Sequence, residues 1–192
     1  MLHKLFSIVI TTLLACNSVQ AVEIDKGASY FTRVNIWYEN PDNIPSTNYH
    51  RGDMIPVNSK IILRRLAKNV IAFEDQDGQV FTIIHNSGYV RKSIRELFDH
   101  LFSAKDVMLE NETYAKFTPL EKENIMQGTV TEGMSKEAVV MAYGYPPTHK
   151  TPSLNRPVWR YWDARASQLL VYFKGGKVSR VEEYSPGQFL FR

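Results

Sequence analysis

The sequence has almost no cysteine: among its 192 residues only Cys16 carries a thiol. One cysteine cannot form an intramolecular disulfide, and a thiol-based metal site needs several. The protein is therefore expected to be stabilised by its hydrophobic core. A chain of this length with 44% hydrophobic residues can supply one.

The chain also lacks a strong excess of charge of either sign. Its formal net charge is +3 at pH 7, and its lysines and arginines are not gathered into one block. Proteins that bind nucleic acids concentrate positive charge on one surface or segment. No nucleic-acid partner is therefore expected.

At the start of the chain, no hydrophobic run is long enough to be expected to cross a membrane as a helix. The apolar run 5–15 is too short, because a span needs about 20 residues. Together with the preceding Lys4 it is typical of a signal peptide over residues 1–21 and predicts export. Two processing routes remain open: cleavage after Ala21, or lipidation of Cys16, which ends a lipobox-like Leu-Leu-Ala-Cys sequence. The expected location is the bacterial periplasm, with an outer-membrane anchor if the cysteine is lipidated.

Motifs of known catalytic chemistry are absent as well. The sequence contains neither a Gly-x-Ser-x-Gly nucleophile elbow nor a glycine-rich phosphate loop. Its histidines are scattered, without the spacing of a zinc-binding helix. Glu182 and Glu183 fall on opposite faces of a predicted strand, which is wrong for concerted acid–base work. We therefore expect no catalysis, no metal and no cofactor.

Residues 22–103 have the rhythm of short strands and are expected to form one domain. Asp77-Gly78, between two apolar runs, predicts a hairpin with a type I′ turn. The spacing of the strands predicts a small antiparallel barrel. The segment from Arg51 to Val57 resembles a bacterial Src-homology-3-like domain. The predicted strands cover 30–38, 60–66, 70–73 and 80–84.

A helix is predicted at the end of this region. Ser93 and Glu96 form a capping box, in which each side chain accepts a hydrogen bond from the backbone of the other. Apolar residues follow at helical spacing: Ile94, Leu97, Phe98, Leu101 and Phe102. Weak periodicity over 104–117 indicates a linker.

Residues 118–192 are expected to form a second domain of two helices and three strands. Thr118 opens another capping box, and Gly128 is a plausible stop for that helix. Ser135 caps a second helix, which Gly144 ends. The strands follow at 158–162, 169–174 and 177–184.

This order of elements predicts a two-layer sandwich of helices on a three-stranded meander, so the whole chain is expected to be α+β. In the last strand, Val178 and Val181 can face the same side only if a bulge interrupts the alternation.

Four motifs of this second region resemble the SmpA/OmlA, or BamE-like, family of bacterial envelope lipoproteins. They are Gly133-Met134-Ser135-Lys136-Glu137-Ala138-Val139, Gly144-Tyr145-Pro146, Trp159-Arg160-Tyr161 and Leu170-Val171-Tyr172-Phe173-Lys174-Gly175-Gly176-Lys177-Val178. The resemblance implies the helix-helix-meander fold and a non-catalytic, accessory role in outer-membrane protein assembly. It also implies envelope or outer-membrane proteins as partners. The residues that carry the motifs are expected to be mostly structural: Gly133, Ser135, Gly144, Pro146, Trp159, Tyr161 and Gly175.

Three residues near these motifs are candidates for contact with a partner: Tyr145, His149 and Trp162. Along a strand Trp159 and Tyr161 share one face, which we interpret as core, and Trp162 lies on the other. Exposed large aromatic residues often mark interfaces. The protein is thus expected to be an envelope interaction module.

A second interpretation places function in the first region, as a periplasmic protein that binds cell-wall peptide or glycan. It predicts an aromatic groove lined by Tyr30, Tyr49 and one of Trp37 and Tyr38, since those two alternate along a strand.

Overall fold

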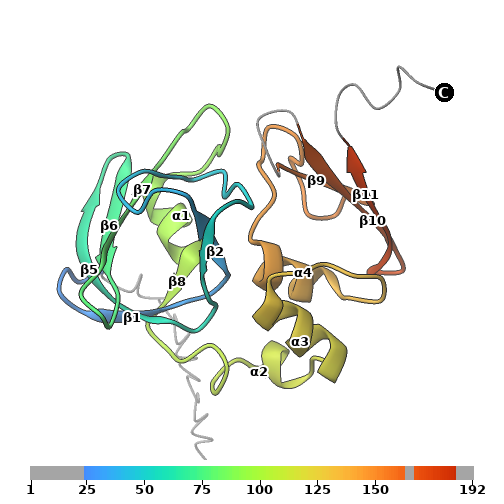
Figure 1. Ribbon diagram of the computed structural model, residues 1–192, viewed down its shortest axis with the longest axis horizontal. Coiled ribbons are helices and arrows are strands. Elements are labelled where there is room, and N and C mark those ends of the chain that lie inside the picture. Colours follow the sequence, from blue (N-terminus) through green and yellow to red (C-terminus); the bar gives the residue numbers. More distant parts are fainter. Residues whose placement is uncertain (1–23, 163–166, 185–192) are drawn as a thin grey trace, which may run out of the picture.

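The computed structural model describes residues 24–162 and 167–184, so the predicted signal peptide, with Cys16 and Ala21, lies outside the described residues. Within them the protein is α+β (Figure 1). One sheet of six strands curls into half a barrel, a second sheet has three strands, and the helices are few and short. No helix in the described ranges is long and apolar enough to cross a membrane.

The six-stranded sheet is built mainly from predicted strands, in the order β3-β7-β6-β5-β1-β8. Its pairs are antiparallel, apart from the parallel contact between β3 and β7. The predicted strand 30–38 is divided, because β2 (Ile36–Tyr38) leaves this sheet and pairs with β4 (Asp53–Ile55). The strands of the large sheet are β1 Ser29–Thr32, β3 Ile44–Pro45, β5 Lys60–Ala67, β6 Val70–Glu74, β7 Val80–Ile84 and β8 Phe102–Ser103.

The hairpin between β6 and β7 is confirmed, but the predicted type I′ turn is wrong. Asp77 does not adopt the positive φ that such a turn requires. The strands end at Glu74 and resume at Val80, which leaves a longer loop. In this loop Asp75 Oδ1 accepts hydrogen bonds from the backbone N–H of Asp77 (3.0 Å) and of Gln79 (2.9 Å). The carboxylate therefore organises the loop in place of a tight turn.

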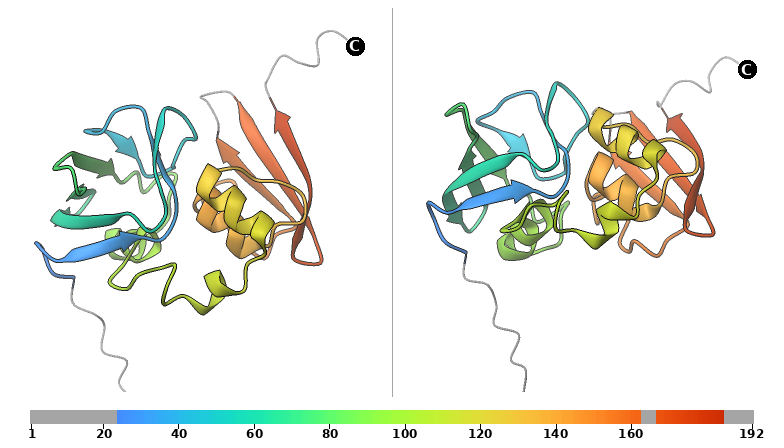
Figure 2. Two further views of the ribbon diagram at one scale, coloured as in Figure 1. Left: turned by 60° about the horizontal axis from the view of Figure 1, so that its bottom comes forward. Right: turned by 90° about the horizontal axis from the view of Figure 1, so that it is seen from below.

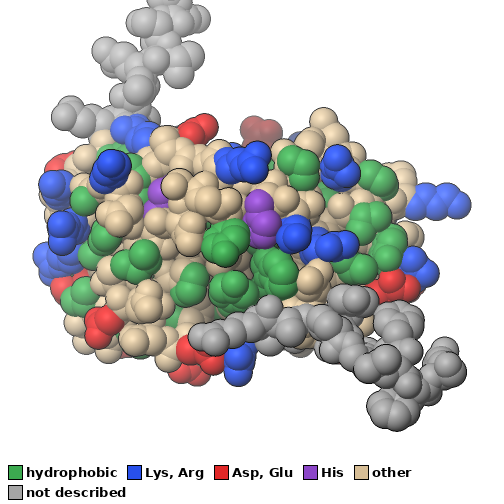
Figure 3. All heavy atoms as spheres, turned by 90° about the horizontal axis from the view of Figure 1, so that it is seen from above, with side chains coloured by type: hydrophobic (Ala, Val, Ile, Leu, Met, Phe, Trp, Pro, Cys, Tyr) green, Lys and Arg blue, Asp and Glu red, His purple; other side chains and the backbone are tan. Residues whose placement is uncertain are grey.

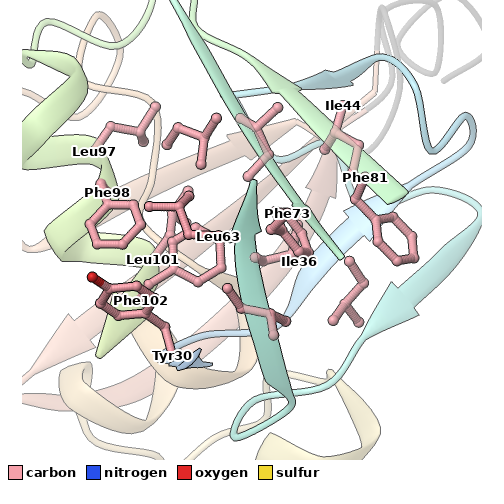
Figure 4. Close-up of a cluster of buried hydrophobic side chains, with 14 of the residues drawn as sticks. Tyr30, Ile36, Ile44, Leu63, Phe73, Phe81, Leu97, Phe98, Leu101 and Phe102 are labelled. Carbon is pink, nitrogen blue, oxygen red and sulfur yellow. The ribbon is translucent and has the colours of Figure 1, made fainter. Parts of the chain in front are cut away.

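Helix α1 (Ile94–Leu101) packs against the inner side of the curled sheet. Its predicted capping box is confirmed: Ser93 Oγ accepts from the Glu96 N–H (3.2 Å), and the Glu96 carboxylate accepts from the Ser93 N–H (2.7 Å). Leu97 and Phe98 enter the hydrophobic cluster of Figure 4. There the rings of Phe98 and Tyr30 meet edge to face at 5.0 Å. Aromatic pairs in this geometry add to the stability that burial provides.

Helices α3 (Pro119–Gln127) and α4 (Lys136–Tyr143) pack with the three-stranded sheet around a second hydrophobic cluster (Figure 2). Trp159 and Tyr161 are its largest side chains, 0% and 1% exposed, which confirms their predicted place in the core. The antiparallel strands lie in the order β11-β10-β9. Their bounds are β9 Val158–Trp162, β10 Gln168–Lys174 and β11 Lys177–Tyr184.

We call the described residues up to 103 the first part of the chain and those from 118 onward the second part. The predicted helix boundaries of the second part are confirmed. Thr118 and Glu121 form the capping box of α3, Gly128 ends it in the left-handed region (φ 65°), and Ser135 caps α4. Glu121 Oε1 also accepts hydrogen bonds from the Ser135 N–H (2.7 Å) and from Lys177 Nζ (3.2 Å). Burial raises the pKa of Glu121, but the hydrogen bonds from these partners and Thr118 lower it to about 2. This carboxylate therefore joins α3, α4 and β11 as an anion.

The last strand contains the bulge that its sequence requires. The pairing with β10 shifts between Val178 and Arg180, which leaves Ser179 as the extra residue. As a result Val178 and Val181 both pack against the second cluster.

Residues 104–117, expected as a linker, are packed against both parts. They contain helix α2 (Glu112–Ala115), and Val107 and Phe117 are buried in the second cluster. The Val107 N–H donates to Asn58 Oδ1 (2.8 Å). The connection, which runs below the two sheets in Figure 1, is therefore anchored at Val107 and Phe117.

The C-terminal end of α4 meets the first part of the chain. An α-helix leaves its last four carbonyls without intrahelical partners, and these need other donors when they are buried. The first part supplies such donors to three of these carbonyls. The bonds are Asn35 N to Met141 O (3.0 Å), Asn35 Nδ2 to Ala142 O (3.0 Å), Asn48 Nδ2 to Tyr143 O (3.1 Å) and His50 Nε2 to Tyr143 O (2.8 Å).

Two glycines allow this close approach. A Cβ added to Gly128 would lie 2.6 Å from Cζ2 of Trp37, and one added to Gly144 would lie 2.5 Å from Nδ2 of Asn48. Both glycines also have a positive φ, 65° and 75°. Side chains at these helix ends would therefore separate the two parts or strain the backbone.

Asn35 makes more hydrogen bonds at this junction than Asn48 or His50 does. It is 0% exposed, and besides its bond to α4 its Nδ2 donates to Ile125 O of α3 (2.7 Å). Its Oδ1 accepts from the Val57 N–H (2.7 Å). One amide thus satisfies three buried backbone groups from three segments.

We predict that Asn35→Ala lowers the free energy of unfolding by about 3 kcal/mol, because the Ala142 carbonyl and the Val57 N–H lose their side-chain partner and the Ile125 carbonyl keeps only its hydrogen bond from Gly128. This change in the free energy of unfolding can be measured by urea denaturation, with tryptophan fluorescence as the signal. The control is Asn69→Ala, an exposed asparagine between β5 and β6, expected to change stability by less than about 0.5 kcal/mol. Equal effects of the two substitutions would show that the amide does not hold the junction.

Candidate functional site

Three aromatic side chains form a row on the surface: Tyr89, His149 and Trp162. The rings of Tyr89 and His149 are 4.9 Å apart, and those of His149 and Trp162 are 6.2 Å apart and nearly parallel (10°). Tyr89 is 49% exposed and the other two are partly exposed. We call these three residues the aromatic row. Tyrosine and tryptophan are among the residue types enriched in interfaces between proteins.

The aromatic row is assembled from both parts of the chain. Tyr89 lies in the loop after β7, His149 in the loop after α4, and Trp162 at the end of β9. These two loops rise at the top of Figure 1, and Figure 3 views the molecule from that side, where hydrophobic side chains gather beside histidines. Thr148 joins the loops: its Oγ1 donates to Tyr89 O (3.1 Å) and accepts from the Arg91 N–H (2.8 Å). The row is therefore supported by hydrogen bonds beneath it.

A hollow of about 370 Å³ lies near this row. Its lining includes Trp37, Tyr38, Tyr49 and Arg51. The backbone N–H of His50, between the last two, contacts Trp162 O at 3.4 Å, so the hollow adjoins the end of β9. The other lining residues are Glu39, Asn40, Asn43 and Pro45. Aromatic surfaces with a few amide and charged groups suit extended peptides and sugars.

The hollow differs from the predicted groove in two residues. Tyr30 is buried in the first cluster, 5% exposed, and takes no part. Trp37 and Tyr38 both line the hollow, although alternation was expected to admit only one of them. Consecutive residues of β2 thus both contribute to the lining, although the ring of Tyr38 also packs edge to face on Phe81 (5.1 Å).

Tyr145 does not join His149 and Trp162. Its ring stacks on His100 of α1 at 4.0 Å, and the residue is only partly exposed. Burial raises the pKa of the Tyr145 hydroxyl, while the charge of Arg33 lowers it. Tyr145 therefore packs between the two parts, away from the row.

The remaining predicted site residues have structural contacts. Tyr161 Oη donates to Gly144 O (3.0 Å), and the Gly133 N–H donates to Val178 O (2.8 Å). Pro146 is buried, and Gly175 lies in the turn between β10 and β11. Ser135 and Trp159 have their places at the α4 cap and in the second cluster.

Two residues of this region were not foreseen from the sequence: Tyr89 and His50. Tyr89 follows Ser87-Gly88, which indicates only a turn. His50 is 8% exposed, stacked on Tyr143 at 3.6 Å and edge-on to Tyr161 at 5.6 Å. No local pattern reveals either position, because the neighbouring rings come from distant parts of the chain.

The His50 ring is held in its neutral form. Its Nε2 contacts a carbonyl oxygen and must donate, so Nδ1 carries the lone pair, and Nδ1 is buried without a partner among the described residues. Burial lowers the pKa of His50 to about 4, although its backbone contacts with Tyr143 and Trp162 raise it. In the described part of the chain, no group of three or more His, Cys, Asp or Glu residues could hold a metal ion.

Comparison of the chain with known protein families, with curated proteins and with solved structures finds no match in any of the three.

We predict that His50 makes the fold sensitive to acid. Between the unfolded pKa of 6.5 and the folded pKa of about 4 the unfolded chain binds more protons. The free energy of unfolding should therefore fall by about 3 kcal/mol from pH 7 to pH 4 through this residue. In His50→Gln an amide N–H can replace the donor to Tyr143 O without titrating. Denaturation curves across this range should show a shallower pH dependence for the variant, and parallel curves would contradict the prediction.

Proposed function

We propose that the protein is a non-catalytic, exported component of the bacterial envelope that binds protein partners through the aromatic row. The observation that carries the proposal is the stack of Tyr89, His149 and Trp162, in which Tyr89 is half exposed and the other two rings are partly exposed beside two hydrogen-bonded loops. Tyrosine and tryptophan are enriched among the residues that dominate binding energies. Because both loops are hydrogen-bonded, a partner does not have to bear the full entropic cost of ordering them.

The finer architecture belongs to this proposal. We infer a barrel-like domain over 22–103 and an SmpA/OmlA-like domain over 118–192. The order α3-α4-β9-β10-β11 and the capping at Ser135 and Gly144 support the second inference. The first is supported by the curl of the six-stranded sheet around α1.

A role as accessory factor in outer-membrane protein assembly or envelope integrity follows from the resemblance. Its partners would be envelope or outer-membrane proteins, and the protein would work in the periplasm. A lipid on Cys16 would add contact with the membrane surface, whereas cleavage after Ala21 would release the protein.

Site-specific photo-crosslinking in the bacterial host tests the proposal. Benzoylphenylalanine at position 89 or 162 should give the same discrete crosslinked species with an envelope protein. The matched control is position 109, where Leu109 is 86% exposed in the segment before α2, at the bottom of Figure 1, whereas the two loops lie at the top. We expect adducts from the crosslinker at positions 89 and 162 and none from position 109. Identical patterns from all three positions, or none, would refute a partner at the aromatic row.

The hollow favours a second candidate function, the binding of cell-wall peptide or glycan. Its lining combines the aromatic residues Tyr38 and Tyr49 with the hydrogen-bonding residues Asn40, Asn43 and Arg51. The ion pair of Arg51 with Glu39 (3.5 Å) is exposed on both sides, so a ligand could replace it at little cost.

Co-sedimentation with purified cell-wall sacculi tests this second function. Tyr49→Ala should reduce the affinity by about tenfold, the effect of losing one aromatic contact in a binding site. Tyr89→Ala, which alters the row and not the hollow, is the control and should bind as the wild type does. Sedimentation unchanged by Tyr49→Ala would exclude the hollow as the site.

A further inference from the structure

A cleft of about 300 Å³ lies between the two parts, on the side of α2 and α4. The segment between β1 and β2 contributes Val34. Helix α4 contributes Val140 and Met141, which lie four residues after Lys136 and Glu137 along the same side of the helix. Val34 and Met141 are buried side chains, 1% and 6% exposed, and Val140 packs against both hydrophobic clusters. The cleft therefore has an apolar floor and a volume at the lower end of the range, about 300–1,000 Å³, of small-molecule sites.

Two positively charged side chains line this cleft: Arg33 and Lys136. Lys136 Nζ is fixed above the Trp159 ring (5.3 Å) by hydrogen bonds to the carbonyls of Leu154 (2.6 Å) and Arg156 (3.1 Å). An ammonium has three N–H groups, so one remains after these bonds. The lysine is therefore held in place with donor capacity to spare.

Arg33 has still more unused capacity. It is exposed, and in the described ranges its guanidinium donates one hydrogen bond, to Asp99 O (3.0 Å). A guanidinium has five N–H groups in a planar fork that matches a carboxylate. Glu137 is the single acidic residue in the lining of the cleft and is exposed at its edge. Positive charge thus exceeds negative charge around an apolar floor.

We propose that this cleft binds a small amphiphilic carboxylate, an apolar body that carries one negative charge. The apolar body contacts Val34, Val140 and Met141, and the carboxylate accepts hydrogen bonds from the cations on the walls. Charge-assisted hydrogen bonds of this kind are about twice as strong as neutral ones. Because Arg33 and α4 belong to different parts of the chain, the ligand bridges the junction and stabilises it. This site is independent of the aromatic row.

Two fluorescent probes with the same aromatic body test the proposal. 8-Anilinonaphthalene-1-sulfonate is an anion, and N-phenyl-1-naphthylamine is its neutral counterpart. In titrations of the purified protein, Arg33→Gln should weaken binding of the anion by about tenfold, the loss of one charge-assisted contact, and leave the neutral probe within about twofold. Arg65→Gln, on the exposed surface of β5, is the matched control and should change neither.

A blocking variant locates the probe. Thr113→Trp places a bulky ring in the cleft from α2, whereas Glu112→Trp places the same ring on the same helix outside the lining. The first should abolish binding of both probes and the second should not. Decanoate should displace the anionic probe and decanol should not. Equal effects of the two tryptophans, or of the two arginine variants on the anion, would overturn the proposal, provided that thermal melts show each variant folded.

Discussion

Hydrogen bonds at the C-terminal end of α4 are the constraint on which the rest of the structure depends. A buried helix end is costly unless its last carbonyls find donors. Here the donors are Asn35, Asn48 and His50, all from the other part of the chain. They can reach these carbonyls in only one arrangement of the two parts. Buried polar groups, together with the hydrophobic clusters, thus determine the relative position of the two sheets.

The aromatic row and the cleft both depend on this junction, unlike the hollow, which is lined by the first part alone. The aromatic row combines Tyr89 of the first part with His149 and Trp162 of the second, and the cleft combines Arg33 with Lys136 in the same way. Neither part presents either surface alone. Any change that loosens the end of α4 should therefore disturb both surfaces together, even though they lie on different sides of the junction.

Local signals predicted much of the fold and only part of the site. Capping depends on residues within about four positions of each other, so the helix starts at Ser93 and Thr118 could be predicted from sequence. His149 and Trp162 were candidates from their neighbourhood, but Tyr89 was not, since its partner lies 60 residues away. The type I′ turn predicted at Asp77 was wrong because the Asp75 side chain, two residues earlier, accepts hydrogen bonds from the backbone and stabilises a longer loop.

The sequence by itself determined where α1, α3 and α4 begin, where most strands of the two larger sheets lie, the need for a bulge in β11, and the burial of Trp159 and Tyr161. These depend on periodicity and on hydrogen bonds between near neighbours in the chain. Only the tertiary structure decided that a buried Asn35 would bond to three separate segments, and that Tyr145 would stack on His100. Such contacts depend on how all the other elements pack, because residues distant in the chain meet only after the whole fold has brought them together.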